Sequence, residues 1–496
     1  IDVTPETTAA FIGRALRGPL NTPVLLSNFG EFRRRFGDVW SRSSLGPAVE
    51  QFFSHGGQRL YVVRVANNAR GAMICLPASG SALVLRALET GSTERIRAAV
   101  DYDGVEDSDE LFNLTLQRVN AKSGLIEDQE LFAALSYRVD AENSVGDALQ
   151  SSALACVEQP LPSHRPEVTL RDGSRFELTY VEHAQAGTDG AELSDYDLVG
   201  SRKAGTGLFA LGEIDRFDVL YLPPPGKHTD VGPAATLAAE RYCHERGAML
   251  IVDPLAEWET ADQAVLGIRR LGYGSPHMLG YFPRVKERGD TDQAPRVAGG
   301  AIAGLLCKHD RSYGAWQDMD QPGMDFKRQL LPGVLVDEED RQLLNRAGLN
   351  AIVVGPAGRP RLLGSVTMGR GVGTHREFAS LAVQRLCLQI VSSISNATRW
   401  AVFESIDAAL AKRIRAQIAM YLGGLSDLGA FADTRYVVEC DAGVSRRDDQ
   451  KEHGVTVLLV FHPLSSHDPI SLTLHLTAAG CRVGSTAFAP SIENCA

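Results

Sequence analysis

Residues 217–282 contain three short apolar segments separated by two segments of helical character. The apolar segments are FDVLYL (217–222), AMLIVD (248–253) and HMLGYF (277–282), and each has the length of a buried strand. Residues 231–247 and 260–271 between them have the length of helices. Short connections and nearly continuous apolar strands are typical of a parallel sheet with helices on both faces. This stretch therefore predicts an α/β core built on a mixed or parallel sheet.

The first 65 residues carry the same signature. Residues 8–13, 24–26 and 59–65 are rich in apolar and β-branched side chains, which predicts strands. Residues 29–36 and 45–53 have apolar side chains at helical spacing. The order of strand, helix and strand predicts that this part of the chain belongs to the α/β core.

The composition changes between residues 72 and 195, where short alternating runs dominate. Phe112, Leu114 and Leu116 are interleaved with polar residues, which is the pattern of a half-buried strand. Residues 120–124 (NAKSG) predict a hairpin turn, and residues 101–110 predict an exposed acidic loop. The stretch therefore predicts a β-rich domain inserted into the α/β core.

The last third of the chain predicts an α+β subdomain. One helix is expected over residues 374–394, opened by a capping box in which Thr374 and Glu377 satisfy first-turn amides. A second helix is expected over residues 406–422, which carry one apolar stripe. Three strands are expected after it, at residues 436–440, 455–461 and 470–476.

Charge and composition exclude several classes of protein. The 496 residues carry a formal net charge of −11, which argues against a nucleic-acid scaffold, because such a scaffold needs a basic face, and no nucleic-acid partner is expected. No apolar run is long enough to cross a bilayer, so no direct membrane insertion is expected. The eight cysteines are scattered singly, which predicts reduced, packed thiols rather than a zinc or redox site.

A parallel α/β sheet raises the question of nucleotide binding. No G-x-x-x-x-G-K-[ST] loop occurs, and the turn PPPGK (223–227) after the first strand of the stretch lacks the G-x-G-x-x-G spacing. Its prolines also remove the amides that a phosphate needs. Asp253 ends a strand where many α/β enzymes hold a catalytic carboxylate, but a lone Asp there more often caps a turn. A nucleotide-dependent α/β enzyme stays an alternative.

Two further sets of side chains are of the types found in catalytic or metal sites, but their positions in the sequence do not fit such sites. Cys243 and His244 are neighbours on a predicted helix and point to different sides, which disfavours a nucleophile pair. His462, His467 and His475 have no carboxylate or thiolate set to complete a metal site. The sequence therefore predicts no catalytic residues, no cofactor and no metal, and a protein that is not an enzyme.

Basic residues gather on the second predicted C-terminal helix. Lys412 lies opposite the apolar stripe of this helix, and Arg413 and Arg415 lie on its flanks. Such a group is either a solvated helix face or, in an acidic protein, a docking surface for an acidic partner. The sequence leaves both interpretations open.

Segments spread over nearly the whole chain resemble contractile tail-sheath proteins of myophages and phage-tail-like injection systems. They occur in the family's order, at residues 8–15, 52–57, 61–65, 83–87, 130–136, 242–243, 251–254, 297–304, 314–316, 344–350, 364–367, 385–386, 400–404 and 429–430. The chain departs from the family at residues 463–469, which read PLSSHDP where the family commonly has a Pro-Ala-Glu-Phe-like segment.

The resemblance implies a structural subunit without catalysis. Such subunits form stacked hexameric rings around an inner tail tube and contract to drive the tube through a target envelope. The partners would be further copies of the chain, the inner tube protein, and the baseplate and tail terminator proteins. The protein would fold and assemble in the bacterial host cytoplasm and end in the tail sheath of a virion or particle. A component of a type VI secretion sheath, which is built from two different chains, is a further alternative.

The resemblance also implies four regions and two arms. Residues 1–71 would form an N-terminal arm and the first part of the core, 72–195 the inserted outer domain, 196–365 the rest of the core, and 366–496 the C-terminal subdomain with a polymerisation arm. The arms would add strands to sheets of neighbouring subunits. The residues expected in them are Ile1, Asp2, Val3, Thr4, Ile470, Leu472, Leu474 and Leu476. Lys412, Arg413 and Arg415 would face the tube.

Overall fold

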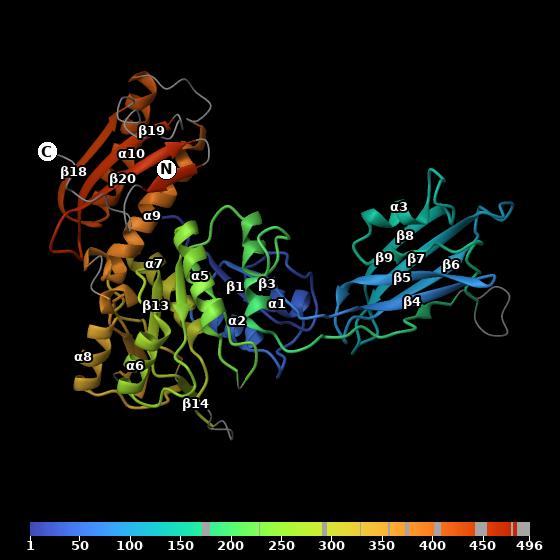
Figure 1. Ribbon diagram of the computed structural model, residues 1–496, viewed down its shortest axis with the longest axis horizontal. Helices are drawn as coiled ribbons and strands as arrows, with labels where there is room; N and C mark the ends of the chain where they lie inside the picture. Colours follow the sequence, from blue (N-terminus) through green and yellow to red (C-terminus); the bar gives the residue numbers. More distant parts are fainter. Residues whose placement is uncertain are drawn as a thin grey trace.

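The computed structural model describes residues 1–170, 179–227, 229–289, 295–327, 329–355, 358–372, 376–400, 408–441, 454–477 and 480–483. Figure 1 shows a central α/β part, a β-rich lobe to one side of it, and a helix-and-sheet part at the opposite end.

The central part is organised by one eight-stranded mixed sheet. Its order is β17 (Pro360–Leu363), β16 (Asn350–Val354), β13 (Met278–Phe282), β12 (Met249–Val252), β11 (Val219–Tyr221), β1 (Ala9–Gly13), β3 (Leu60–Arg64) and β2 (Val24–Leu26). The six inner strands are parallel, and the two outermost strands are antiparallel to their neighbours. The predicted parallel α/β sheet is confirmed. Since β1 lies between β3 and β11, the N-terminal strand joins the two halves of the sheet.

Helices cover both faces of this sheet, and side chains alternate between the two cores. Phe11 of β1 lies in the core with α2 (Leu45–Ser54), α7 (Gly299–Tyr313) and α9 (Leu381–Thr398). Ile12 lies in the core on the other face. The helices of that second face are α4 (Asp195–Val199), α5 (Pro233–Arg246), α6 (Ala261–Leu271) and α8 (Glu338–Ala347). The period of two along a strand produces this division.

Helices α2 and α7 approach each other through glycines. A Cβ atom on Gly300 would lie 2.3 Å from the carbonyl oxygen of Ala48, and one on Gly304 would lie 2.4 Å from that of Phe52. These two glycines are four residues apart and therefore lie on one side of α7. The contact needs them because any side chain would push the two helices apart.

The β-rich lobe consists of two small sheets around a core of its own. One sheet has the order β4 (Gly71–Ala78), β5 (Ser81–Thr90), β9 (Ala155–Glu158); the other has the order β10 (Val181–Glu182), β6 (Ile96–Asp101), β7 (Leu111–Val119), β8 (Ile126–Ser136). Phe112, Leu114 and Leu116 are buried between the sheets, as the alternation predicted. A short helix, α3 (Val145–Ala148), completes the lobe. The predicted β-rich insertion thus has the expected content, while the boundaries at residues 71/72, 195/196 and 365/366 stay predictions.

The C-terminal part contains α9, α10 (Ala408–Asp427) and an antiparallel sheet. The sheet order is β18 (Phe431–Asp441), β19 (Gly454–Pro463), β20 (Ile470–Thr477), β21 (Gly480–Val483). The strands expected at 436–440, 455–461 and 470–476 are confirmed. The remaining elements are α1 (Phe29–Phe36), beside α2, and a small ribbon of β14 (Val285–Glu287) and β15 (Leu330–Pro332). No described helix is long and apolar enough to span a bilayer.

Three predicted helix boundaries are wrong, and one of them is the end of α9, which lies at Thr398 and not at residue 394. Helix α9 begins at Leu381, where the Ser380 side chain accepts the N–H of Val383, and not at residue 374. Thr374 lies outside the described residues, and Glu377 lies in a separate short turn. Helix α10 ends at Asp427 and not at 422, because Leu425 continues its buried stripe.

Candidate assembly surfaces

The carboxyl end of the parallel strands carries a network around Asp253, directly after β12. Its Oδ2 accepts the Tyr221 hydroxyl at 2.5 Å, and its Oδ1 accepts the backbone N–H of Gly299 at 3.0 Å. Gly299 is the first residue of α7, so the carboxylate caps that helix. The interpretation of Asp253 as a cap is therefore supported, although the capped helix lies 46 residues further along the chain.

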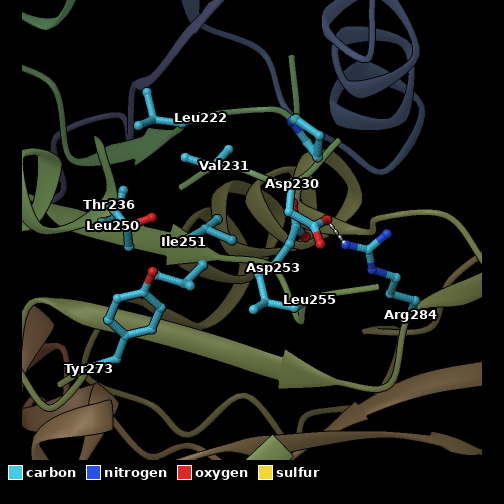
Figure 2. Close-up of a pocket in the computed structure, with 12 residues that line it drawn as sticks. Leu222, Asp230, Val231, Thr236, Leu250, Ile251, Asp253, Leu255, Tyr273 and Arg284 are labelled. Carbon is cyan, nitrogen blue, oxygen red and sulfur yellow. Dashed lines mark hydrogen bonds and ion pairs between the residues drawn. The ribbon is translucent and has the colours of Figure 1, made fainter. Parts of the chain in front are cut away.

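Burial and hydrogen bonds act on Asp253 in opposite directions. Burial outweighs the Tyr221 hydroxyl, Arg284 and the Gly299 amide, which lower the pKa of Asp253, so that this pKa is raised to about 6. Arg284 is held nearby by an ion pair with Asp230 (Figure 2). Its Nε also donates to the carbonyl of Pro254. Asp253 and its hydrogen-bond partners thus connect β12, α7 and the loop that follows β13.

The space at this edge of the sheet is small, and its helix N-termini are occupied by carboxylates. The cleft beside Asp253 offers about 30 Å³, against the several hundred Å³ of an ordinary ligand site. At the start of α5, Asp195 accepts the N–H groups of Gly232 (2.9 Å) and Ala235 (3.1 Å). A phosphate would need these amides. At the N-termini of α5 and α7, amides that a phosphate would use are therefore bonded to the chain's own carboxylates.

The other candidates for chemistry are Cys243 with His244 and the histidines of the C-terminal sheet. Cys243 is buried, and burial raises the pKa of its thiol well above the usual range, whereas His244 is exposed. His475 contacts the Thr456 hydroxyl, and His462 contacts the carbonyl of Ser466. Within the described residues, no group of three His, Cys, Asp or Glu side chains is placed to hold a metal.

The first residues of the chain lie against the C-terminal helices, and Figure 1 shows the N-terminus beside the C-terminal sheet. The carbonyl of Val3 accepts the Gln389 side chain of α9 at 2.8 Å. A Cβ atom on Gly424 of α10 would lie 2.9 Å from Val3, so the two are in close contact. Asp2 and Thr4 are exposed, and Ile1 and Val3 are half-buried. Residues 1–4 form no strand within the chain.

A buried ion pair fixes the same segment where it enters β1. Asp310 of α7 pairs with Arg385 of α9 and accepts the Thr7 hydroxyl at 2.5 Å. Burial alone would raise the pKa of Asp310, but Arg385, His309 and Thr7 outweigh it and lower this pKa to about 2. Arg385 lies in one of the segments that resemble the family (385–386), but the sequence does not show that it pairs with Asp310. An arginine inside an otherwise apolar helix is the signal, because it requires a counter-charge.

The residues predicted for a C-terminal arm lie inside the sheet of this chain. Strand β20 pairs with β19 on one side and with β21 on the other. Ile470, Leu472, Leu474 and Leu476 are at most 5% exposed. The outer strands of this sheet are β18 and β21.

The three basic residues of α10 are exposed, while Ile414 and Ile418 are buried on its other face. The guanidinium of Arg413 lies 4.4 Å from the ring centre of Trp400, so this side chain is stacked. Lys412 and Arg415 flank it. The predicted basic face on the helix therefore exists.

Comparisons with known proteins give a consistent picture of the fold. No protein-family model matches the sequence, and no curated protein sequence does. Among solved structures, the chain resembles the sheath tail protein Lin1278 of Listeria innocua (TM-score 0.62, 12% identity, 95% of each chain covered). It also resembles the sheath tail protein DSY3957 of Desulfitobacterium hafniense (0.55, 12%, 96% of this chain and 98% of that one). A third similar structure is the PVC sheath complex of an extracellular contractile injection system in its contracted state (0.53, 12%, 94% and 92%).

The similarity spans the central sheet, the lobe and the C-terminal part together, since it covers about 95% of the chain. The chain therefore has the fold of the sheath proteins of phage tails and contractile injection systems.

Proposed function

We propose that the chain is a structural subunit of a contractile sheath, which polymerises as stacked hexameric rings around an inner tube and contracts to drive that tube through an envelope. The observation that carries the proposal is the agreement of the whole chain with several sheath proteins at nearly full length of both partners. A shared central domain alone would support less, because one fold serves many functions.

Assembly would proceed by strand addition at the C-terminal sheet. The outer strand β18 is eleven residues long and has one side without a strand partner among the described residues. Such an edge accepts an extended segment from another chain through backbone hydrogen bonds. Residues 1–4 are the proposed donor, since they lie against α9 and α10, the latter packing on β18, and form no strand of their own. The four apolar residues of β20 would support the acceptor sheet from within.

The basic face of α10 is proposed to meet the inner tube. Lys412, Arg413 and Arg415 are exposed together on one helix of an acidic chain, which favours an acidic partner. The baseplate and tail terminator proteins are the partners proposed for the two ends of the polymer.

The carboxylates of Asp195 and Asp253 argue against the nucleotide-dependent enzyme, because they occupy the amides that a phosphate would use. A type VI secretion sheath, the other alternative, would need a second, different chain for assembly.

Electron microscopy of the purified full chain at high concentration tests the proposal. Rings or tubes formed by this chain alone are the expected result, and removal of residues 1–4 should reduce their number. Monomers under all conditions, with no effect of the deletion, would refute the proposal. Tubes that appear only after a second chain is added would favour the type VI alternative.

A further inference from the structure

A basic cleft lies where the β-rich lobe meets the α/β core. It encloses about 460 Å³ between α1 and the β7–β8 hairpin. Its charged lining consists of four cations and two carboxylates: Arg17, Arg33, Arg34, Lys122, Asp38 and Glu127. The lining therefore has an excess of two positive charges in a chain whose net charge is −11.

Part of this charge is used within the chain. Arg17 pairs with Glu127 at 2.5 Å, and Asp38 pairs with both Arg33 (2.6 Å) and Lys122 (3.2 Å). The pairs Arg17–Glu127 and Lys122–Asp38 connect the β7–β8 hairpin of the lobe to core residues before and after α1, while the Arg33–Asp38 pair lies within the core. The cation that remains in the lining is Arg34, and Arg35, the next residue on α1, lies outside the lining. Both are exposed, and neither forms an ion pair with the described part of the chain.

An acidic loop lies at the opposite end of the same strands. Residues 101–110 connect β6 to β7 and read DYDGVEDSDE. Asp103, Glu106, Asp107 and Asp109 are exposed. The last two form no ion pair with the described residues.

The loop is held in shape by other contacts. Arg165 donates to the carbonyls of Ser108 and Leu111, and its guanidinium lies 3.6 Å from the ring centre of Tyr102. The Tyr102 hydroxyl donates to Pro166 at 2.6 Å. The acids are thus presented on a braced turn, which reduces the ordering entropy that a partner would have to overcome.

The cleft and the loop cannot meet within one chain. Strand β7 runs between them, and its nine residues span roughly 30 Å at 3.3 Å each. The lobe is also fixed to the core, because buried Arg64 donates to the carbonyls of Ala15 and Gly18 in the core and of Thr90 in the lobe.

We propose that the basic cleft lined by Arg34 binds the acidic loop 101–110 of a second copy of this chain. The two surfaces are complementary in charge, and each is exposed. Because they are different surfaces of the same molecule, the contact is head-to-tail and produces a ring or a helix rather than a closed pair. The inference rests on the proposed sheath function, to which it adds a contact between lobes.

Charge reversal tests the contact. The cleft variant is Arg34→Glu with Arg35→Glu, and the loop variant is Asp107→Lys with Asp109→Lys. All four side chains are exposed, so both variants should fold. Each should weaken self-association of the full chain by about tenfold at low salt, measured by sedimentation. Matched controls of equal charge change are Arg269→Glu with Arg270→Glu, and Glu257→Lys with Glu259→Lys, which are exposed elsewhere.

The chain that carries both reversals decides the matter. It should regain self-association, because the charges are complementary again. A combined variant no better than either parent would overturn the proposed contact, as would parents that associate like the controls. If the wild-type chain and every variant form tubes in equal number, the result supports the sheath function and contradicts the proposed contact. The wild-type chain could also form no rings or tubes while the reversals still change pairwise association as expected. That result would support the contact and contradict the sheath function.

Discussion

Asp310 of α7 and Arg385 of α9 form an ion pair whose side chains are only 9% and 7% exposed. The pair joins the helix that begins at the carboxyl end of the central sheet to the helix that leads into the C-terminal part. Thr7 binds the same carboxylate, so the N-terminal segment is tied to this joint. In a sheath whose subunits rotate on contraction, the joint would keep the core and the C-terminal part together.

Replacing Asp310 by Asn should strongly destabilise the chain. The variant leaves the Arg385 guanidinium buried without a counter-charge, which lowers the free energy of unfolding by about 3–5 kcal/mol. Denaturant titration measures this. Asp215→Asn is the control, since it breaks an ion pair with Arg399 that is largely exposed (86% and 59%) and should change stability by at most about 1 kcal/mol. Equal effects of the two variants would contradict a structural role of the buried pair.

Asp253 should make stability depend on pH between about 4 and 6. An aspartate ordinarily has a pKa of 3.8, whereas the pKa of Asp253 in the folded chain is about 6, so the folded chain holds a proton that the unfolded chain has lost in this range. Stability from this group therefore falls as pH rises from 4 to 6. Asp253→Asn removes this pH dependence. The free energy of unfolding of the variant, relative to that of the wild type, should therefore rise by up to about 3 kcal/mol between pH 4 and 6. A difference that does not vary with pH would show that Asp253 does not titrate there.

A methyl group at Gly300 should disturb the contact of α2 with α7. The Cβ of Gly300→Ala would meet the Ala48 carbonyl at 2.3 Å, and overpacking of this kind destabilises by about 1–3 kcal/mol. Gly212→Ala is the matched control, because no atom lies within 4 Å of its Cβ position. Thermal unfolding of both variants makes the comparison. Equal melting temperatures of Gly300→Ala and the control would contradict a close contact between the two helices at Gly300.

Reversal of Lys412 and Arg415 to Glu should weaken binding to the inner tube more than ring formation. Both side chains are exposed on α10, so the variant should fold and its effect should decrease with salt. Arg413 is left unchanged because it stacks on Trp400. Co-sedimentation with the tube protein and ring counts in micrographs separate the two effects, and Arg269→Glu with Arg270→Glu is the control. Equal loss of rings and tube binding would indicate a general defect of assembly.

Much of the fold follows from local pattern. The apolar segments at 217–222, 248–253 and 277–282 form β11, β12 and β13. A strand that is apolar on both faces is buried only in a sheet that helices cover on both sides. The alternation at Phe112, Leu114 and Leu116 likewise determined which side of β7 is buried. Helix ends follow less directly from the sequence, since a cap depends on a single side chain and Ser380 is as able to supply it as Thr374.

The sequence by itself thus determined the strands and helices of the core, their order and the β-rich character of the insertion, because periodicity acts between neighbouring residues. Only the tertiary structure decided that Asp253 caps α7, that Asp310 meets Arg385, and that β20 lies between two strands of its own chain. It also placed the acidic loop and the basic cleft at opposite ends of β7. These relationships join residues far apart in the chain, and the packing that brings them together leaves no local pattern in the sequence.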